Sequence, residues 1–191
     1  MLPRRALLCV LAGLALPLFS QDSSSKDKSL DIRSSVGDLH MGGDADAKKV
    51  GLPLYPGARL KSGDENNNQA NLSIFTEAFG MKLVVANYVS DDAPSKVLDF
   101  YRDKLKRYGK VLECHSQKHG GDVDVHDDDK DSDKNSGKSK ELKCDEDSGP
   151  VTELKVGTED NQHIVAVEPS EGKGAHFALV YVHTRGKQGE I

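Results

Sequence analysis

Acidic residues and histidines that could bind metal ions are concentrated in a polar stretch of the chain. Residues 122–135 are DVDVHDDDKDSDKN, and seven aspartates stand against one lysine between positions 122 and 133. Clustered carboxylates are typical ligands of hard cations such as Ca²⁺. Divalent-cation binding is therefore one hypothesis for this stretch, and its candidate ligands are His126, Asp127, Asp129, Asp131 and Asp133.

The same stretch does not match a calcium-binding EF-hand. If Asp129 were position 1 of the loop, position 6 would be Lys134 instead of glycine and position 12 would be Lys140 instead of glutamate. Residues 117–140 also lack apolar periodicity. We therefore interpret them as a disordered acidic insert, with weak, non-specific divalent-cation binding as the alternative.

The start of the chain, MLPRRALLCVLAGLALPLFSQ, has the layout of a secretion signal. Arg4 and Arg5 form a short positive region, an apolar run follows, and the small Ser20 suits the position before cleavage. The run is shorter than the roughly 20 residues of a membrane-spanning helix. We predict a signal peptide over residues 1–20 and a periplasmic or secreted protein. A retained anchor is the alternative, and the paired arginines leave Sec and twin-arginine export both open.

Removal of the signal changes the meaning of the three cysteines. Cys9 leaves with it, so Cys114 and Cys144 remain, one on each side of the acidic insert. Two cysteines in an oxidising compartment favour a single disulfide. That bond would close the base of the insert.

A redox or transition-metal site is the alternative for these cysteines, since thiolates and imidazoles suit zinc or copper. The short spacings of redox pairs and structural zinc sites are missing, so we prefer the disulfide. The candidate ligands of such a site are Cys114, His115, His119, His126 and Cys144.

Charge and motifs argue against two broad classes of function. The net charge is −5, or −7 without Arg4 and Arg5, whereas nucleic-acid phosphates need a basic surface. The sequence has no G-x-S-x-G, H-E-x-x-H, P-loop or G-x-G-x-x-G fingerprint. Nothing pairs Glu153 and Glu168 as acid and base. We therefore predict no catalytic residue and no cofactor beyond a divalent cation.

The sequence predicts one long helix. Residues 93–108 have apolar positions at helical spacing, Pro94 in the first turn, and Gly109 just after the end. Asp91 or Asp92 is the expected N-cap. The apolar stripe consists of Val97, Leu98, Tyr101, Leu105 and Tyr108.

Strands are expected nearly everywhere else. Residues 30–41 alternate around Gly37 and predict a short hairpin within a polar leader, 21–49. We expect one domain over 50–185 and a flexible tail over 186–191. A helix followed by a run of strands indicates an α+β fold, with a mainly antiparallel sheet and one packed amphipathic helix. The expected strands of the domain are 71–79, 81–90, 110–116, one beginning at 141–145, 151–157, 163–168 and 175–184.

Three stretches, GLPLYPGARL, SDDAPSKVLDFYRDKLKRYG and FALVYVHTRG, resemble a group of exported bacterial proteins. Those proteins combine a Tyr-Pro-Gly-Ala segment with an Asp-capped Phe-Tyr helix on an antiparallel sheet. The resemblance covers residues 50–185. It implies export and the fold class, and it supplies no activity.

Together these observations favour an exported, non-enzymatic binding or structural module. Its partner would be a protein or a small ligand, and the sequence leaves the oligomeric state open. One alternative is a metal-handling protein that uses the acidic insert. A third is an enzyme whose site the motifs do not reveal.

Overall fold

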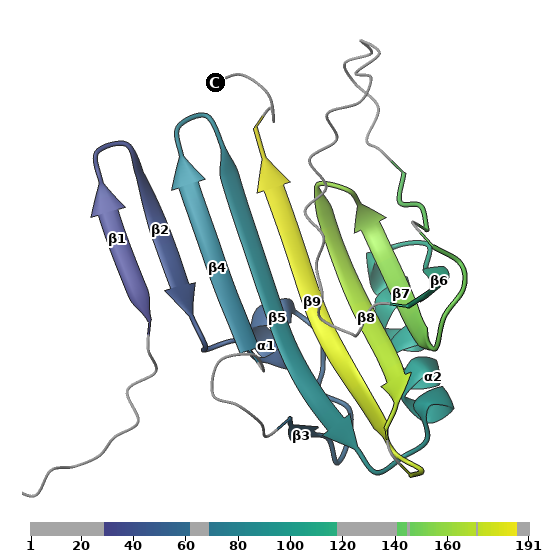
Figure 1. Ribbon diagram of the computed structural model, residues 1–191. Helices are drawn as coiled ribbons and strands as arrows, with labels where there is room; N and C mark the ends of the chain where they lie inside the picture. Colours follow the sequence, from purple (N-terminus) through teal and green to yellow (C-terminus); the bar gives the residue numbers. More distant parts are fainter. Residues whose placement is uncertain (1–28, 62–68, 118–140, 145, 171, 187–191) are drawn as a thin grey trace, which may run out of the picture.

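The computed structural model describes residues 29–61, 69–117, 141–144, 146–170 and 172–186. In these ranges nine strands form one antiparallel sheet in the order β1-β2-β4-β5-β9-β8-β7-β6, and β3 pairs with the C-terminal end of β5 (Figure 1). The strands are β1 (Leu30–Ser34), β2 (Gly37–Gly42), β3 (Arg59–Leu60), β4 (Gln69–Thr76), β5 (Gly80–Ser90), β6 (Leu112–Ser116), β7 (Val151–Thr158), β8 (Asn161–Pro169) and β9 (Ala175–Arg185).

The helices of the described residues lie on one side of the sheet, behind it in Figure 1. They are α1 (Ala47–Val50) and α2 (Pro94–Leu105), and α2 continues as the 3-10 turn η1 (Lys106–Tyr108). We call this the helix side and the opposite surface the helix-free side. The arrangement confirms the predicted α+β fold, with a mainly antiparallel sheet and one long helix packed on it.

The helix predicted over residues 93–108 is confirmed as α2 and η1, but the prediction that an aspartate caps it is wrong. The N-cap is Ala93, and no side chain accepts a hydrogen bond there. The carboxylate of Asp92 instead accepts hydrogen bonds from the Tyr55 hydroxyl at 2.9 Å and from the Lys96 ammonium at 2.7 Å. Asp92 therefore ties the start of the helix to the segment that precedes β3.

The hairpin predicted over residues 30–41 is confirmed as β1 and β2. It is part of the main sheet, because β2 pairs along its whole length with β4. The strand predicted to begin at 141–145 is wrong, since Glu141 forms only an isolated bridge with Thr158. One backbone bridge is too little to hold an extended segment as a strand.

The main core lies between α2 and the strands that it crosses, β7, β8 and β9. The predicted stripe of α2 supplies Val97, Tyr101 and Leu105, all fully buried. Alternate residues of the strands meet them, as the period of two of a strand requires. These strand residues are Leu154, Val156, Val165, Val167, Phe177 and Leu179.

Tyrosine hydroxyls fix the chain segment that crosses the helix side between β2 and β3. The Tyr88 hydroxyl accepts a hydrogen bond from the Ala47 amide at 2.9 Å, and the Tyr101 hydroxyl accepts one from the Tyr55 amide at 3.1 Å. Burial raises the pKa of the Tyr101 phenol, so it stays neutral. Each bond satisfies a backbone group that would otherwise be buried without a partner.

Removing the Tyr101 hydroxyl tests this anchoring. Tyr101→Phe keeps the ring in the core but leaves the buried Tyr55 amide without its acceptor, so we expect the free energy of unfolding to fall by about 1–3 kcal/mol. Urea unfolding followed by circular dichroism measures it. Tyr181→Phe is the control. The Tyr181 ring contacts other rings, but its hydroxyl forms no hydrogen bond with another described residue. Equal losses in the two variants would contradict the assignment.

Candidate functional site

The metal ligands predicted from the acidic insert lie outside the described residues. This holds for His126, Asp127, Asp129, Asp131 and Asp133, and also for His119. His115 lies in β6 beside Cys114. Within the described ranges, no group of three or more histidine, cysteine, aspartate or glutamate side chains is placed to hold a metal ion.

The predicted disulfide is confirmed. Cys114 in β6 is bonded to Cys144, with 5.5 Å between their Cα atoms and a sequence separation of 30. The bond holds Cys144 against β6, next to the outer edge of that strand. There Asp147 forms a parallel bridge with His115, and the carboxylate of Glu146 accepts a hydrogen bond from the Gln117 amide. This edge of the sheet is therefore covered in part, at His115 and Gln117.

Loss of the disulfide should lower stability. In the chain-entropy view, opening a closed loop of this length costs roughly 3–4 kcal/mol of unfolding free energy. We expect Cys114→Ala/Cys144→Ser to show that loss in urea unfolding. Reduction of the wild type by dithiothreitol should lower its urea midpoint to a value close to that of the double variant. A midpoint that neither the substitutions nor the reduction changes would contradict a stabilising bond.

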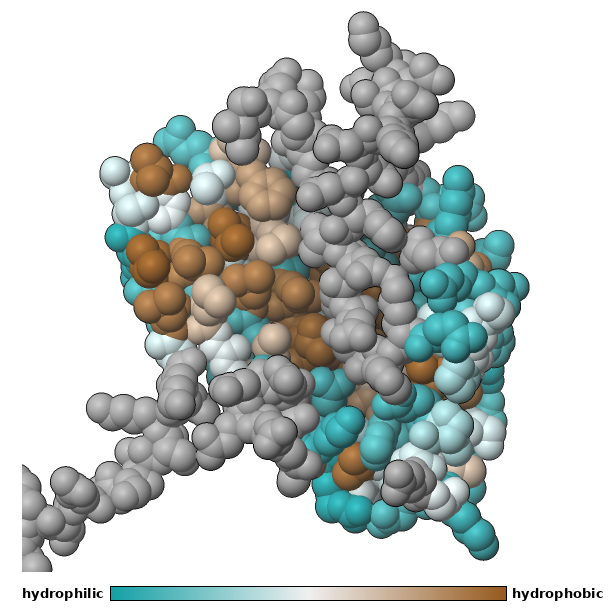
Figure 2. Space-filling model, in the orientation of Figure 1, coloured by the Kyte–Doolittle hydropathy of each residue, from teal (hydrophilic) through white to brown (hydrophobic). Residues whose placement is uncertain are grey.

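At the other end of the sheet, the two faces exchange their character: the helix side is polar there, and the helix-free side is apolar. In β1 and β2, and at Leu72 and Ile74 of β4, the apolar residues point to the helix-free side, and they continue onto β5 in matched cross-strand pairs. Figure 2 shows them as a continuous brown area on the left of the face that turns toward the viewer. We call this area the apolar surface; it consists of Leu30, Ile32, Leu39, Met41, Leu72, Ile74, Met81 and Leu83.

Much of the apolar surface is accessible to solvent. Leu30, Ile32 and Met41 are 52%, 48% and 47% exposed, and the remaining members are partly buried. A shallow hollow of about 210 Å³ lies where Ile32, Leu39 and Ile74 meet the β1–β2 turn. Contiguous exposed apolar areas of this kind typically mark interaction sites.

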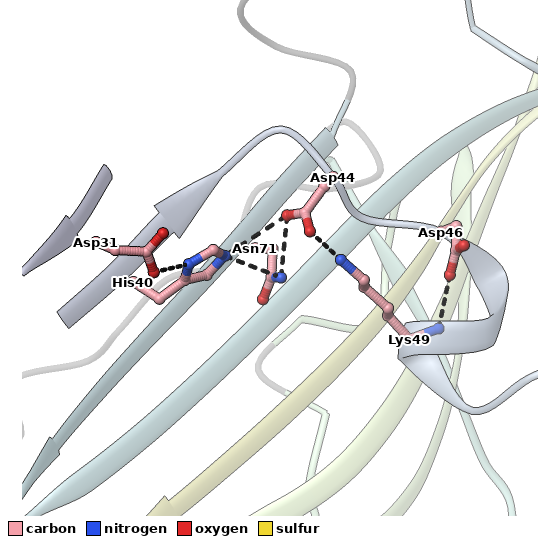
Figure 3. Close-up of polar contacts among 6 residues, drawn as sticks. All are labelled: Asp31, His40, Asp44, Asp46, Lys49 and Asn71. Atoms are coloured by element: carbon pink, nitrogen blue, oxygen red, sulfur yellow. Dashed lines mark hydrogen bonds and ion pairs between the residues drawn. The ribbon is translucent and has the colours of Figure 1, made fainter. Parts of the chain in front are cut away.

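The charged residues of β1 and β2 point to the helix side, as does Asn71 of β4, and several of them form a network there (Figure 3). His40 of β2 has a polar neighbour at each ring nitrogen: Nδ1 forms a hydrogen bond with the Asp31 carboxylate of β1 at 2.7 Å, and Nε2 lies at ion-pair distance, 3.6 Å, from the Asp44 carboxylate. The side-chain amide of Asn71 on β4 donates to Asp44 at 3.1 Å. Asp44 also accepts a hydrogen bond from Lys49 of α1.

The network holds the β1–β2 hairpin to β4 and to α1. Asp46 adds to it as the N-cap of α1, where its carboxylate accepts a hydrogen bond from the Lys49 amide at 2.7 Å. The Asp31–His40 pair resembles the pair that orients a general base. However, the other ring nitrogen of His40, Nε2, faces the Asp44 carboxylate and lies 3.4 Å from the Asn71 amide nitrogen, which fits a positioning role.

Two members of the network have shifted pKa values. The hydrogen bond to Asp31 raises the pKa of His40 above its usual 6.5, against an opposing effect of burial. The hydrogen bond from Lys49 lowers the pKa of Asp44 to about 2. At mildly acidic pH both groups are therefore charged, and the hairpin is held by opposite charges on neighbouring elements.

The stability of the hairpin should depend on pH through His40. Because its folded-state pKa is raised, its contribution is fully present below about 6.5 and is lost as the pH rises through the folded-state value. Asp44 contributes above about 3.8 and loses its effect as the pH falls toward 2. We expect the gap in unfolding free energy between wild type and His40→Gln to shrink above pH 6.5.

Urea unfolding between pH 5 and pH 9 measures that gap. Asp31→Asn should remove the same pH dependence, since it takes away the main cause of the raised pKa. A gap that stays constant over this pH range would contradict a charged His40–Asp31 pair.

β1 forms the edge of the sheet that the described residues leave uncovered. It pairs with β2 on one side only, and no described residue pairs with its other side. All five of its residues are exposed. Such an edge offers unpaired backbone donors and acceptors to another strand. The apolar surface and this edge adjoin, because Leu30 and Ile32 belong to both.

Sequence reasoning found the hairpin but missed the apolar surface and the network. The alternation of Leu30 with Ile32, and of Leu39 with Met41, was the available signal for a one-sided apolar face. The network has no such signal, because Asp44 lies in the segment that the sequence predicts only as part of a polar leader, 21–49.

Within the described ranges, no helix is long and apolar enough to cross a membrane. Comparison of the chain with protein-family models, with curated proteins and with solved structures finds no match in any of the three. What the protein does must therefore be argued from its own geometry.

Proposed function

We propose that this protein is an exported, non-enzymatic binding module that takes up an extended polypeptide at the β1 end of its sheet. The observation that carries the proposal is the apolar surface bordered by the uncovered edge of β1. The predicted signal peptide over residues 1–20 and the Cys114–Cys144 disulfide support export, since disulfides persist in oxidising compartments.

A polypeptide is the partner that uses both features of this end. The uncovered edge needs backbone N–H and C=O groups in register, and a polypeptide strand brings them. The apolar surface contains no charged residue, because Asp31, Arg33 and His40 all point to the helix side. The partner's side chains on that surface are therefore apolar and uncharged.

The structure of the hairpin fits recognition better than catalysis. The network of His40, Asp44 and Lys49 fixes the hairpin on β4 and α1, so the apolar surface is formed before a partner arrives. A preformed surface loses little conformational freedom on binding. The pairing of β2 with β4 along its length has the same effect.

A hydrophobic dye tests whether the folded protein presents this surface. We expect 8-anilinonaphthalene-1-sulfonate to fluoresce with the native protein, and Ile32→Gln/Met41→Gln to lose most of that signal, because the dye binds accessible apolar area. Glutamine changes polarity without adding charge. Circular dichroism confirms that the variant is folded.

The matched control is Leu54→Gln/Leu60→Gln. These leucines are 45% and 46% exposed, close to the values of Ile32 and Met41, but lie away from the apolar surface. The control should keep the fluorescence of the wild type. If both double variants lose the same share of the signal, or if the native protein gives none, the proposal is wrong.

A further inference from the structure

We infer that the polypeptide taken up at β1 is β1 of a second copy of this chain, paired antiparallel across a two-fold axis at Ile32. The inference rests on the proposed function, whose binding edge it uses. Three features of β1 support it: the direction of its backbone groups, the order of its charges, and the contrast with the edge at β6.

The backbone groups of Asp31 and Arg33 point away from β2. Residues opposite each other in an antiparallel ladder alternate between hydrogen-bonded and non-hydrogen-bonded pairs. Ser34 and Gly37 close a two-residue turn, which makes them a hydrogen-bonded pair, as are Ile32 and Leu39. The amides and carbonyls of Asp31 and Arg33 are therefore those that a new strand would meet.

Charge selects one register among those that use these groups. A two-fold axis at Asp31 would place two aspartates opposite each other, and one at Arg33 would do the same with two arginines. An axis at Ile32 places Asp31 of each copy opposite Arg33 of the other copy, which gives two pairs of opposite charge. Within its own chain Arg33 lies opposite Asp38 of β2, and Asp31 contacts His40, so the pairs between copies would extend an alternation of charge that already runs across the hairpin.

The same register also brings together the residues on the helix-free side of β1. Ile32 then lies opposite Ile32 of the second copy, and each Leu30 lies opposite Ser34, all on the helix-free side. The apolar surfaces of the two copies become continuous across the axis. Leu30 and Ile32, which are 52% and 48% exposed, gain cross-strand neighbours.

The assembly closes at two copies. The outer edge of β6 is occupied by the bridge of Asp147 with His115 and held by the Cys114–Cys144 bond. It cannot accept a further strand in the same way. Pairing of β1 with β1 is an isologous contact, so it gives a closed dimer and no filament.

Engineered cysteines test the register directly in the full chain with Cys9→Ser. In a non-hydrogen-bonded pair the Cα atoms lie about 4.5 Å apart, within the range of a disulfide. We expect Ile32→Cys to form a disulfide-linked dimer under mild oxidation at micromolar concentration. Non-reducing electrophoresis and peptide mass mapping identify the bond.

Neighbouring positions provide the matched control. Leu30→Cys alone should form no disulfide-linked dimer, because the register places residue 30 opposite Ser34. A mixture of the Leu30→Cys chain with the Ser34→Cys chain should form the mixed dimer. If Leu30→Cys cross-links to itself as readily as Ile32→Cys, or if the mixture forms no disulfide-linked mixed dimer, the register is wrong.

Charge reversal tests the ion pairs without a new thiol. Arg33→Asp opposes two aspartates at both sites, and we expect the dissociation constant of the dimer, measured by sedimentation equilibrium, to rise about tenfold. Lys48→Asp on α1 makes the same change in net charge and should leave the constant unchanged. Equal constants for wild type and Arg33→Asp would overturn the inference.

The dye experiment separates this inference from the proposed function. A wild type that is monomeric at every concentration, while Ile32→Gln/Met41→Gln still loses dye fluorescence, overturns self-pairing and leaves the binding surface. If the native wild type gives no dye fluorescence, both the proposed function and the inference of self-pairing are wrong.

Discussion

Each face of a sheet must either be covered by other elements or carry side chains that tolerate solvent. In the described residues, the helices cover only part of one face. α1 and α2 lie on β5, β7, β8 and β9, while β1 and β2 extend beyond them. At that end the helix side is occupied by the polar network around His40 and Asp44. The apolar residues of the hairpin therefore lie on the helix-free side, and this inversion is the origin of the apolar surface.

The two edges of the sheet differ for a physical reason. At β6 a covalent bond, Cys114–Cys144, holds a segment against the strand and satisfies part of its edge. At β1 the described residues provide no such cover, and charge on alternate residues, Asp31 and Arg33, is the only protection. Because these charges have opposite signs, they disfavour most pairings but favour one, with an identical strand.

The sequence was sufficient for the elements whose signals are local. The stripe of α2 from Val97 to Leu105 and the β-prone run of β9 predicted their own structures, and the two cysteines predicted their bond. The N-cap failed because Asp92 makes tertiary bonds with Tyr55 and Lys96 instead of capping α2. The network around Asp44 failed because it joins residues from four elements whose proximity only the sheet order creates. The acidic insert, with its candidate ligands, stays a prediction.

Amide hydrogen exchange at β1 tests the central claim most directly, because it reads the edge residue by residue. The amide of Ile32 bonds to β2 within one chain, so its protection should not depend on protein concentration. The amides of Asp31 and Arg33 point outward, and the account predicts that they become protected as the concentration rises, with Ile32 unchanged. Exchange of Asp31 and Arg33 that is equally fast at every concentration would contradict it.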